Sequence, residues 1–117
     1  MLLKLKNKPI LPSLKEKKRY LVYNIIVGQN RLFQAEEIKQ EFNRKMLQYM
    51  GELGYAKAGV IFVNNPKYNQ GIIRVNHKYV DPVKASLTLI ENINNEKVVV
   101  RCKGVSGTLE GSNRFLS

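Results

Sequence analysis

The chain has 117 residues, 44% of them hydrophobic, and its 20 lysines and arginines against nine acids give a formal net charge of +11. A chain of this length and composition forms one folded domain and is not disordered as a whole. It has no apolar run near the roughly 20 residues of a membrane-spanning helix and no signal-peptide core. The single cysteine, Cys102, excludes an internal disulfide and is typical of a reducing compartment, so we expect a soluble cytoplasmic protein.

The positive charge is concentrated at the N-terminus, where residues 1–19 hold seven of the 20 cations and one of the nine acids. This asymmetry favours a polyanionic partner, nucleic acid before an anionic membrane surface. Pro9 and Pro12 interrupt the amphipathic helix that a membrane surface would need. The cations nearest the first predicted strand are Lys15, Lys17, Lys18 and Arg19, and a looser group precedes them at Lys4, Lys6 and Lys8.

The first half of the chain predicts a strand, a helix and a second strand. Residues 19–27 alternate with apolar side chains on both faces, which is typical of a central strand. Residues 34–50 carry an apolar stripe at intervals of three and four, and Gly51 and Gly54 are expected to end this helix. Residues 58–65 form the next predicted strand.

The second half repeats the alternation of strands and helix. Residues 71–77 predict a third strand, and a helix is expected to open at Asp81-Pro82 with Asp81 as its N-cap. Residues 96–104 predict a last strand with Val98, Val100 and Cys102 on one face. We therefore divide the chain into a basic arm at 1–18, a domain at 19–104 and a C-terminal tail at 105–117, for which no regular structure is predicted.

The order β-α-β-β-α-β predicts an α+β, ferredoxin-like sandwich that resembles an RNA-recognition motif, with two helices on one face of a four-stranded antiparallel sheet. The first and third strands are central in that topology. The cations that precede the first strand would then meet the middle of the sheet and hold fixed positions relative to the domain.

Catalysis has little support in the sequence. His77 is the only histidine and has no cysteine or second histidine near it in sequence, so we expect a polar residue at a strand end and no metal site. The one alternative rests on the stretch VGQNRLF (27–33), in which a glycine and an arginine between the first strand and the first helix resemble the anion cradle of acylphosphatases, with Arg31 and Asn30 as the residues it would use. That alternative is a stand-alone hydrolase on the same fold.

Binding of RNA is better supported, because clustered cations gain affinity for phosphates by releasing counterions. Arg74 on the third predicted strand, with Arg101 and Lys103 on the last, could extend the basic surface onto the sheet. The third strand has no aromatic residue, which disfavours base stacking and favours contact with the backbone of a folded RNA. An apolar patch left exposed on the second face of the sheet would mark a protein interface.

Three stretches resemble protein component 2 of archaeal and eukaryotic ribonuclease P. They are LPSLKEKKRYLVYNI (11–25), GIIRVNHKYVDPVKASLTLI (71–90) and VRCKGVSGTL (100–109). The resemblance covers nearly the whole chain, and its most specific parts are the Leu-x-x-x-Lys-Arg-Tyr entry into the first strand and the Val-Ser-Gly-Thr after the last.

The resemblance implies a non-catalytic subunit that stabilises the catalytic domain of the ribonuclease P RNA, which itself removes the 5′ leader of precursor tRNA. It also implies pairing with protein component 3, with Mg²⁺ held by the RNA and no cofactor on this chain. Precursor tRNA would be an indirect partner, and a homodimer and a general RNA- or ribosome-associated adaptor stay open. By the match, Lys15, Lys17, Lys18 and Arg19 are RNA-contact candidates, and Ser106, Gly107 and Thr108 lie close to RNA or a partner. The tail of this chain is short and nearly neutral, whereas family members often have a basic one.

Overall fold

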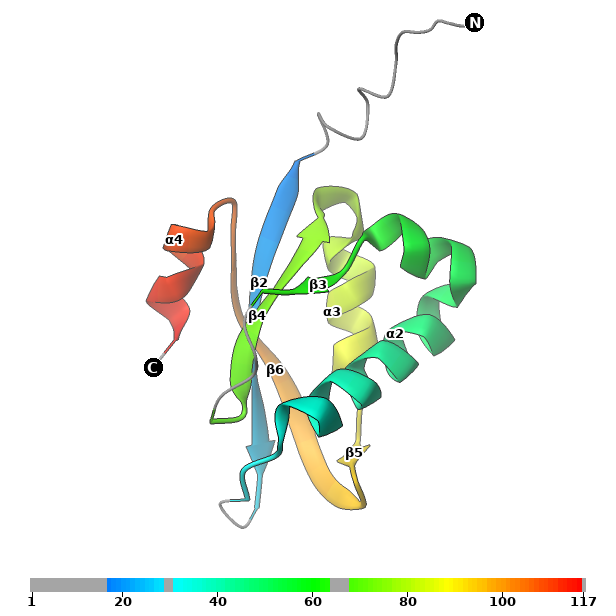
Figure 1. Ribbon diagram of the computed structural model, residues 1–117, viewed down its shortest axis with the longest axis vertical. Helices are drawn as coiled ribbons and strands as arrows, with labels where there is room; N and C mark the ends of the chain where they lie inside the picture. The colour runs from blue at the N-terminus through cyan, green and yellow to red at the C-terminus, as the bar shows by residue number, and fades with distance from the viewer. Residues whose placement is uncertain (1–16, 29–30, 64–67, 117) are drawn as a thin grey trace, which may run out of the picture.

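The computed structural model describes residues 17–28, 31–63 and 68–116 (Figure 1). The basic residues from Lys4 to Lys15 lie outside these ranges. In chain order the elements are β2 (Lys18–Val27), α2 (Ala35–Ala58), β3 (Ile61–Phe62), β4 (Gln70–Asn76), the 3₁₀ turn η1 (His77–Tyr79), α3 (Val80–Thr88), β5 (Asn92–Ile93), β6 (Glu96–Ser106), α4 (Leu109–Ser112) and the 3₁₀ turn η2 (Asn113–Phe115).

The strands form one antiparallel sheet in the order β3-β4-β2-β6-β5. The first strand, β2, is central as predicted, with β4 on one side and β6 on the other. The described sheet has five strands, and the predicted four-stranded sheet lacked β5. This short strand pairs with the start of β6 through a turn at Asn94 and Asn95, whose φ angles of 52° and 69° suit a tight hairpin.

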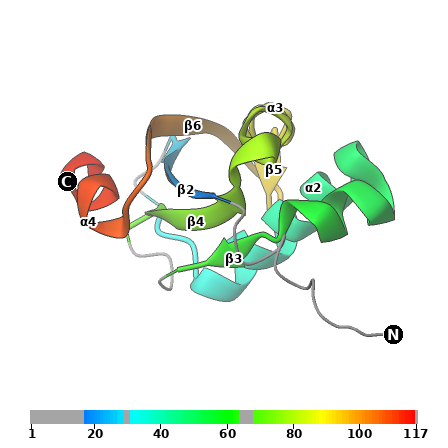
Figure 2. The same cartoon turned by 90° about the horizontal axis from the view of Figure 1, so that it is seen from above.

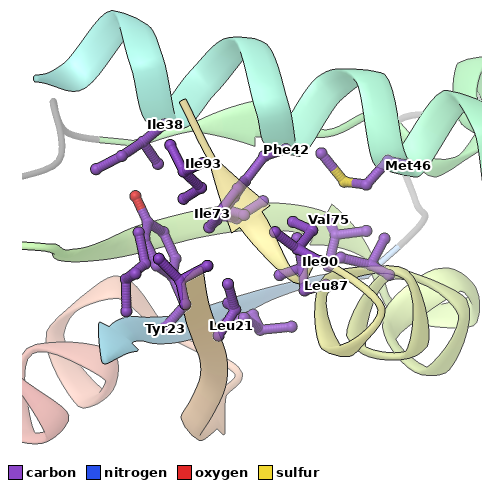
Figure 3. Close-up of a cluster of buried hydrophobic side chains, with 14 of the residues drawn as sticks. Leu21, Tyr23, Ile38, Phe42, Met46, Ile73, Val75, Leu87, Ile90 and Ile93 are labelled. Carbon is purple, nitrogen blue, oxygen red and sulfur yellow. The ribbon is translucent and has the colours of Figure 1, made fainter. Parts of the chain in front are cut away.

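The core lies between the sheet and the two long helices, α2 and α3 (Figure 3). Alternate residues of β2 point into it, and Leu21 and Tyr23 are fully buried. The Tyr23 ring meets the Phe42 ring of α2 edge to face, with 4.8 Å between centroids. The apolar stripe predicted for the first helix is the one that packs here, since Ile38, Phe42 and Met46 are all fully buried.

The opposite side of the sheet, here called the outer face, carries the remaining residues of the same strands. Val22 and Ile72 are cross-strand partners on this face and are fully buried, although they lie outside the main core. Their cover comes from α4 and η2, which pack on the side of the sheet away from α2 and α3 (Figure 2). The outer-face residues are Lys18, Tyr20, Val22, Asn24 and Ile26 of β2, Gln70, Ile72 and Arg74 of β4, and Lys97, Val99, Arg101, Gly104 and Ser106 of β6.

The expectation of an irregular segment after residue 104 was wrong. Strand β6 continues to Ser106, and the Thr108 side chain then caps α4 by accepting a hydrogen bond from the Gly111 N–H at 3.0 Å. Gly104 is the reason that this segment can lie on the sheet, because a Cβ at that position would overlap the Phe115 ring. The glycine and serine residues that suggested an irregular tail therefore allow this segment to pack closely on the sheet.

The two long helices also differ from their predicted ends. Helix α2 is interrupted at Gly51 (φ 77°, ψ 171°) but resumes and ends at Gly59, which adopts the left-handed conformation. Helix α3 begins at Val80, so Asp81 lies in its first turn and is not the N-cap. Asn76 instead accepts from the Lys78 N–H at 3.0 Å and starts the 3₁₀ turn that leads into the helix. Among the described helices, none is long and apolar enough to cross a membrane.

The close contact between Gly104 and Phe115 predicts that substitutions at these two positions have non-additive effects on the free energy of unfolding. We expect Gly104→Ala to lower the free energy of unfolding by about 1–3 kcal/mol, because the new methyl group displaces the Phe115 ring. In a Phe115→Ala background the same change should be neutral, or stabilising by up to about 1 kcal/mol, since alanine suits a strand better than glycine. Urea unfolding of the four proteins measures the coupling. Equal losses in both backgrounds would show that η2 does not pack on β6.

Candidate nucleic-acid interface

Backbone hydrogen bonds hold the described part of the basic run (Lys15, Lys17, Lys18 and Arg19) where it joins β2. The Lys17 carbonyl accepts a hydrogen bond from the His77 N–H at 3.0 Å, and His77 Nδ1 lies 3.2 Å from the same oxygen. Lys18 then pairs with Asn76, and Arg19 with Val75. His77 is thus a polar residue at a strand end that helps to hold the basic run. Lys15, the other predicted contact in this run, lies outside the described residues.

Arg19 connects the basic run to the segment after β6. Its Nη1 donates to the Lys18 carbonyl at 3.0 Å, and a Cβ on Gly107 would lie 3.9 Å from the same nitrogen. Two stretches that are nearly 90 residues apart in the chain therefore meet where β2 begins and β4 and β6 end (Figure 1). We call this part of the molecule the entry end.

Arg74 also lies at the entry end. On the outer face Tyr20 has Arg74 as its cross-strand neighbour on β4 and Ser106 on β6. The Arg74 Nε is buried and has no hydrogen-bond partner among the described residues. This guanidinium shares the outer face with Lys18 and is not fully satisfied by protein groups, so it is suited to bind a phosphate.

The hydroxyl groups of the Ser-Gly-Thr motif are used by the chain itself. Ser106 Oγ accepts from the Thr108 N–H at 3.2 Å, and Thr108 Oγ1 caps α4. Gly107, between them, is exposed beside Arg19. The motif therefore shapes the turn that brings Gly107 to the basic run, and its predicted proximity to RNA stays a prediction.

Arg101 and Lys103 do not join this cluster. Arg101 is exposed opposite Asn24, and Lys103 stands at the irregularity in the β2–β6 register, where its Nζ lies 3.3 Å from Gln70 Oε1. The covered row of Val22, Ile72 and Gly104 separates them from the entry end. The sequence predicted one continuous basic surface, whereas the structure separates Arg101 and Lys103 from the cations at the entry end.

The acylphosphatase-like alternative finds its arginine already engaged. Arg31 Nη2 lies 3.0 Å from Glu37 Oε2, and its guanidinium sits 4.8 Å above the centre of the Phe33 ring. The backbone N–H of Gln34, aided by Asn94 and Arg31, lowers the pKa of the Glu37 carboxyl below its usual value. An arginine paired with an ionised acid is a poor anion cradle; Asn30 lies outside the described residues.

Cys102 behaves as a core residue. Its thiol is half-buried against the main core, and burial raises its pKa above the ordinary cysteine value. A thiol with a raised pKa is a weak nucleophile at neutral pH. In the described ranges, no three histidine, cysteine or acidic side chains gather where they could hold a metal ion.

Fold and charge together define a small α+β protein whose central strand carries anchored cations on an open end of the sheet. The Rpp14/Pop5 family model matches residues 19–117, so the chain belongs to the Rpp14/Pop5 family.

Curated relatives support the same assignment. The chain is 39% identical over 112 residues to "Ribonuclease P protein component 2" of Pyrococcus furiosus, covering 94% of this chain and 92% of the relative. It is 38% identical over 110 residues to the protein of the same name from Thermococcus gammatolerans, covering 93% and 90%. A chain in the structure "Cryo-EM structure of yeast Ribonuclease MRP" shares the fold, with a TM-score of 0.62 and 18% identity over 80% of this chain and 76% of that one.

The anchored cations predict a change in salt dependence. We expect Lys17→Ala/Lys18→Ala to lower the slope of log K against log salt for RNA binding by roughly one to two phosphate contacts, because each lysine releases about one counterion. Filter binding between 50 and 300 mM KCl, about the range in which such contacts weaken, measures the slope. Lys45→Ala/Lys57→Ala removes the same charge from α2 and should leave the slope unchanged. Equal slopes for all three proteins would remove the basic run from the interface.

Proposed function

We propose that this chain is a non-catalytic, RNA-binding protein subunit of ribonuclease P. The main support is its match, over nearly its whole length, to relatives that carry the name ribonuclease P protein component 2. The entry end supplies a physical means for the role, because Lys18 and Arg19 are held by β-sheet pairing and Lys17 by the hydrogen bond from the His77 N–H. Fixed cations match the phosphates of a folded RNA without the entropy cost of ordering a free arm.

In this proposal the chain stabilises the catalytic domain of the ribonuclease P RNA, and the RNA cleaves the 5′ leader from precursor tRNA with Mg²⁺ that it binds itself. Protein component 3 is the proposed protein partner, precursor tRNA is contacted indirectly, and the site of action is the cytoplasm. We also assign the sheet and the helices α2 and α3 to the ferredoxin-like class, with β5 as an addition at the edge. The order of the four strands other than β5, which is β3-β4-β2-β6, supports this assignment.

Reconstitution tests the proposal directly. Precursor-tRNA cleavage is measured with the ribonuclease P RNA and protein component 3, with and without this chain. We expect the chain to raise the cleavage rate at low Mg²⁺, because added cations replace part of the screening that the RNA fold requires. The Lys17→Ala/Lys18→Ala protein should need more Mg²⁺ for the same rate. A rate that does not depend on the chain at any Mg²⁺ concentration would contradict the proposal.

A general RNA adaptor is the second candidate, and a competition assay separates the two. At physiological salt the chain should prefer the ribonuclease P RNA over an unrelated RNA of equal length, since anchored cations fit one folded shape. Equal affinity for both RNAs would favour the adaptor. Hydrolysis of an acyl phosphate that is lost in Arg31→Ala would instead favour the enzyme.

A further inference from the structure

The outer face carries a second feature at its other end, where β2 ends and β6 begins. Ile26 and Val99 are cross-strand partners there and are 46% and 60% exposed. Leu32 and Tyr68, exposed to 60% and 68%, line a hollow of about 340 Å³ together with Ile26. We call these four residues the exit patch. They come from four segments of the chain and together leave an apolar surface in water, which single scattered apolar residues do not.

The charged residues on the outer face beside the exit patch are all cations. Lys97 and Arg101 flank Val99 along the outer row of β6, and Lys103 follows. Arg31, which also lines the hollow, is neutralised by Glu37. None of the outer-face residues defined above is an aspartate or a glutamate. The patch is therefore apolar at its centre and basic on the β6 side.

This composition fits a protein better than RNA. Phosphates require cations but gain nothing from exposed isoleucine, leucine and valine, and bases stack mainly on aromatic rings, of which the patch has one. An apolar side chain surrounded by carboxylates would fill the hollow, cover the aliphatic surface and pair with the lysine and arginine side chains. Charge complementarity thus specifies an acidic, apolar partner surface.

We propose that the exit patch docks a second protein subunit of the ribonucleoprotein, through an apolar anchor ringed by acidic residues. The inference rests on the proposed function and adds to it the surface by which the chain meets its protein partner. From Lys18 to Ile26 the strand rises about 26 Å, at about 3.3 Å per residue, so the entry end and the exit patch lie far enough apart to be used together. One chain would then link RNA at one end of β2 to protein at the other.

The test uses protein component 3 as the probe and the variant Ile26→Thr/Val99→Thr. Threonine keeps the β-branched shape that suits a strand and removes apolar surface only from exposed positions, so the variant should fold. We expect its Kd for component 3, measured by calorimetry, to rise at least about tenfold. Its affinity for the ribonuclease P RNA alone should not change. Leu89→Thr, at a position that is 51% exposed outside the patch, is the matched control and should bind component 3 like the wild type.

A charge variant tests the acidic character of the partner separately. Lys97→Glu should weaken binding of component 3 at low salt and lose most of this effect at 0.5 M KCl, whereas Lys57→Glu on α2 should have no effect. Thermal unfolding confirms that each variant is folded, and Val99→Thr alone replaces the double variant if that protein is not.

The outcomes separate the inference from the proposed function. If the wild type binds RNA and component 3 but the double variant binds component 3 equally well, the inference is wrong and the proposed function stands. The inference is also wrong if the double variant loses RNA affinity instead, or if only self-association changes in light scattering, because the occupant is then RNA or a second copy. A wild type that binds neither RNA nor component 3 contradicts the proposed function and the inference with it.

Discussion

The pairing of β2 on both of its edges is the constraint on which the rest of the structure depends. Because β4 and β6 hold this strand from either side, one set of its side chains is committed to the core and the other to the outer face. The same pairing fixes Lys17, which directly precedes the strand, since its carbonyl accepts a hydrogen bond from the His77 N–H at the end of β4. Lys17, Lys18 and Arg19 therefore hold fixed positions relative to the domain, which cations in a solvated tail would not.

The segment α4–η2 gives the outer face two ends of different chemistry. By packing on Gly104 it buries Val22 and Ile72 in the middle of the face, which leaves the parts on either side exposed. At the entry end lie the cations of the basic run, the half-buried Arg74 guanidinium and the exposed turn at Gly107, which suit phosphates. At the exit end they are aliphatic side chains beside lysine and arginine, which suit a protein surface. A single small sheet can therefore present two separate binding chemistries along one strand.

Local patterns predicted the long elements well, because their side-chain periodicity is set by what each element buries. The alternation through β2 and the stripe of Ile38, Phe42 and Met46 are of this kind. Short elements were missed, although two had a local signal: an Asn-Asn pair that makes the β5 hairpin turn, and Thr108 as the N-cap of α4. In the C-terminal segment the glycine and serine content favoured the prediction of an irregular tail. Composition does not show which glycine is required for close packing.

The sequence by itself determined the charge asymmetry, the central position of the first strand and the fusion of the cations to it, because these follow from residue order and from local alternation. It could not determine that Arg19 meets Gly107, that Arg74 lies at the same end of the sheet while Arg101 does not, or that Ile26 and Val99 remain exposed. Each of these depends on strand register and on where α4–η2 comes to lie, which are set by contacts between residues far apart in the chain. Only the tertiary structure decides them.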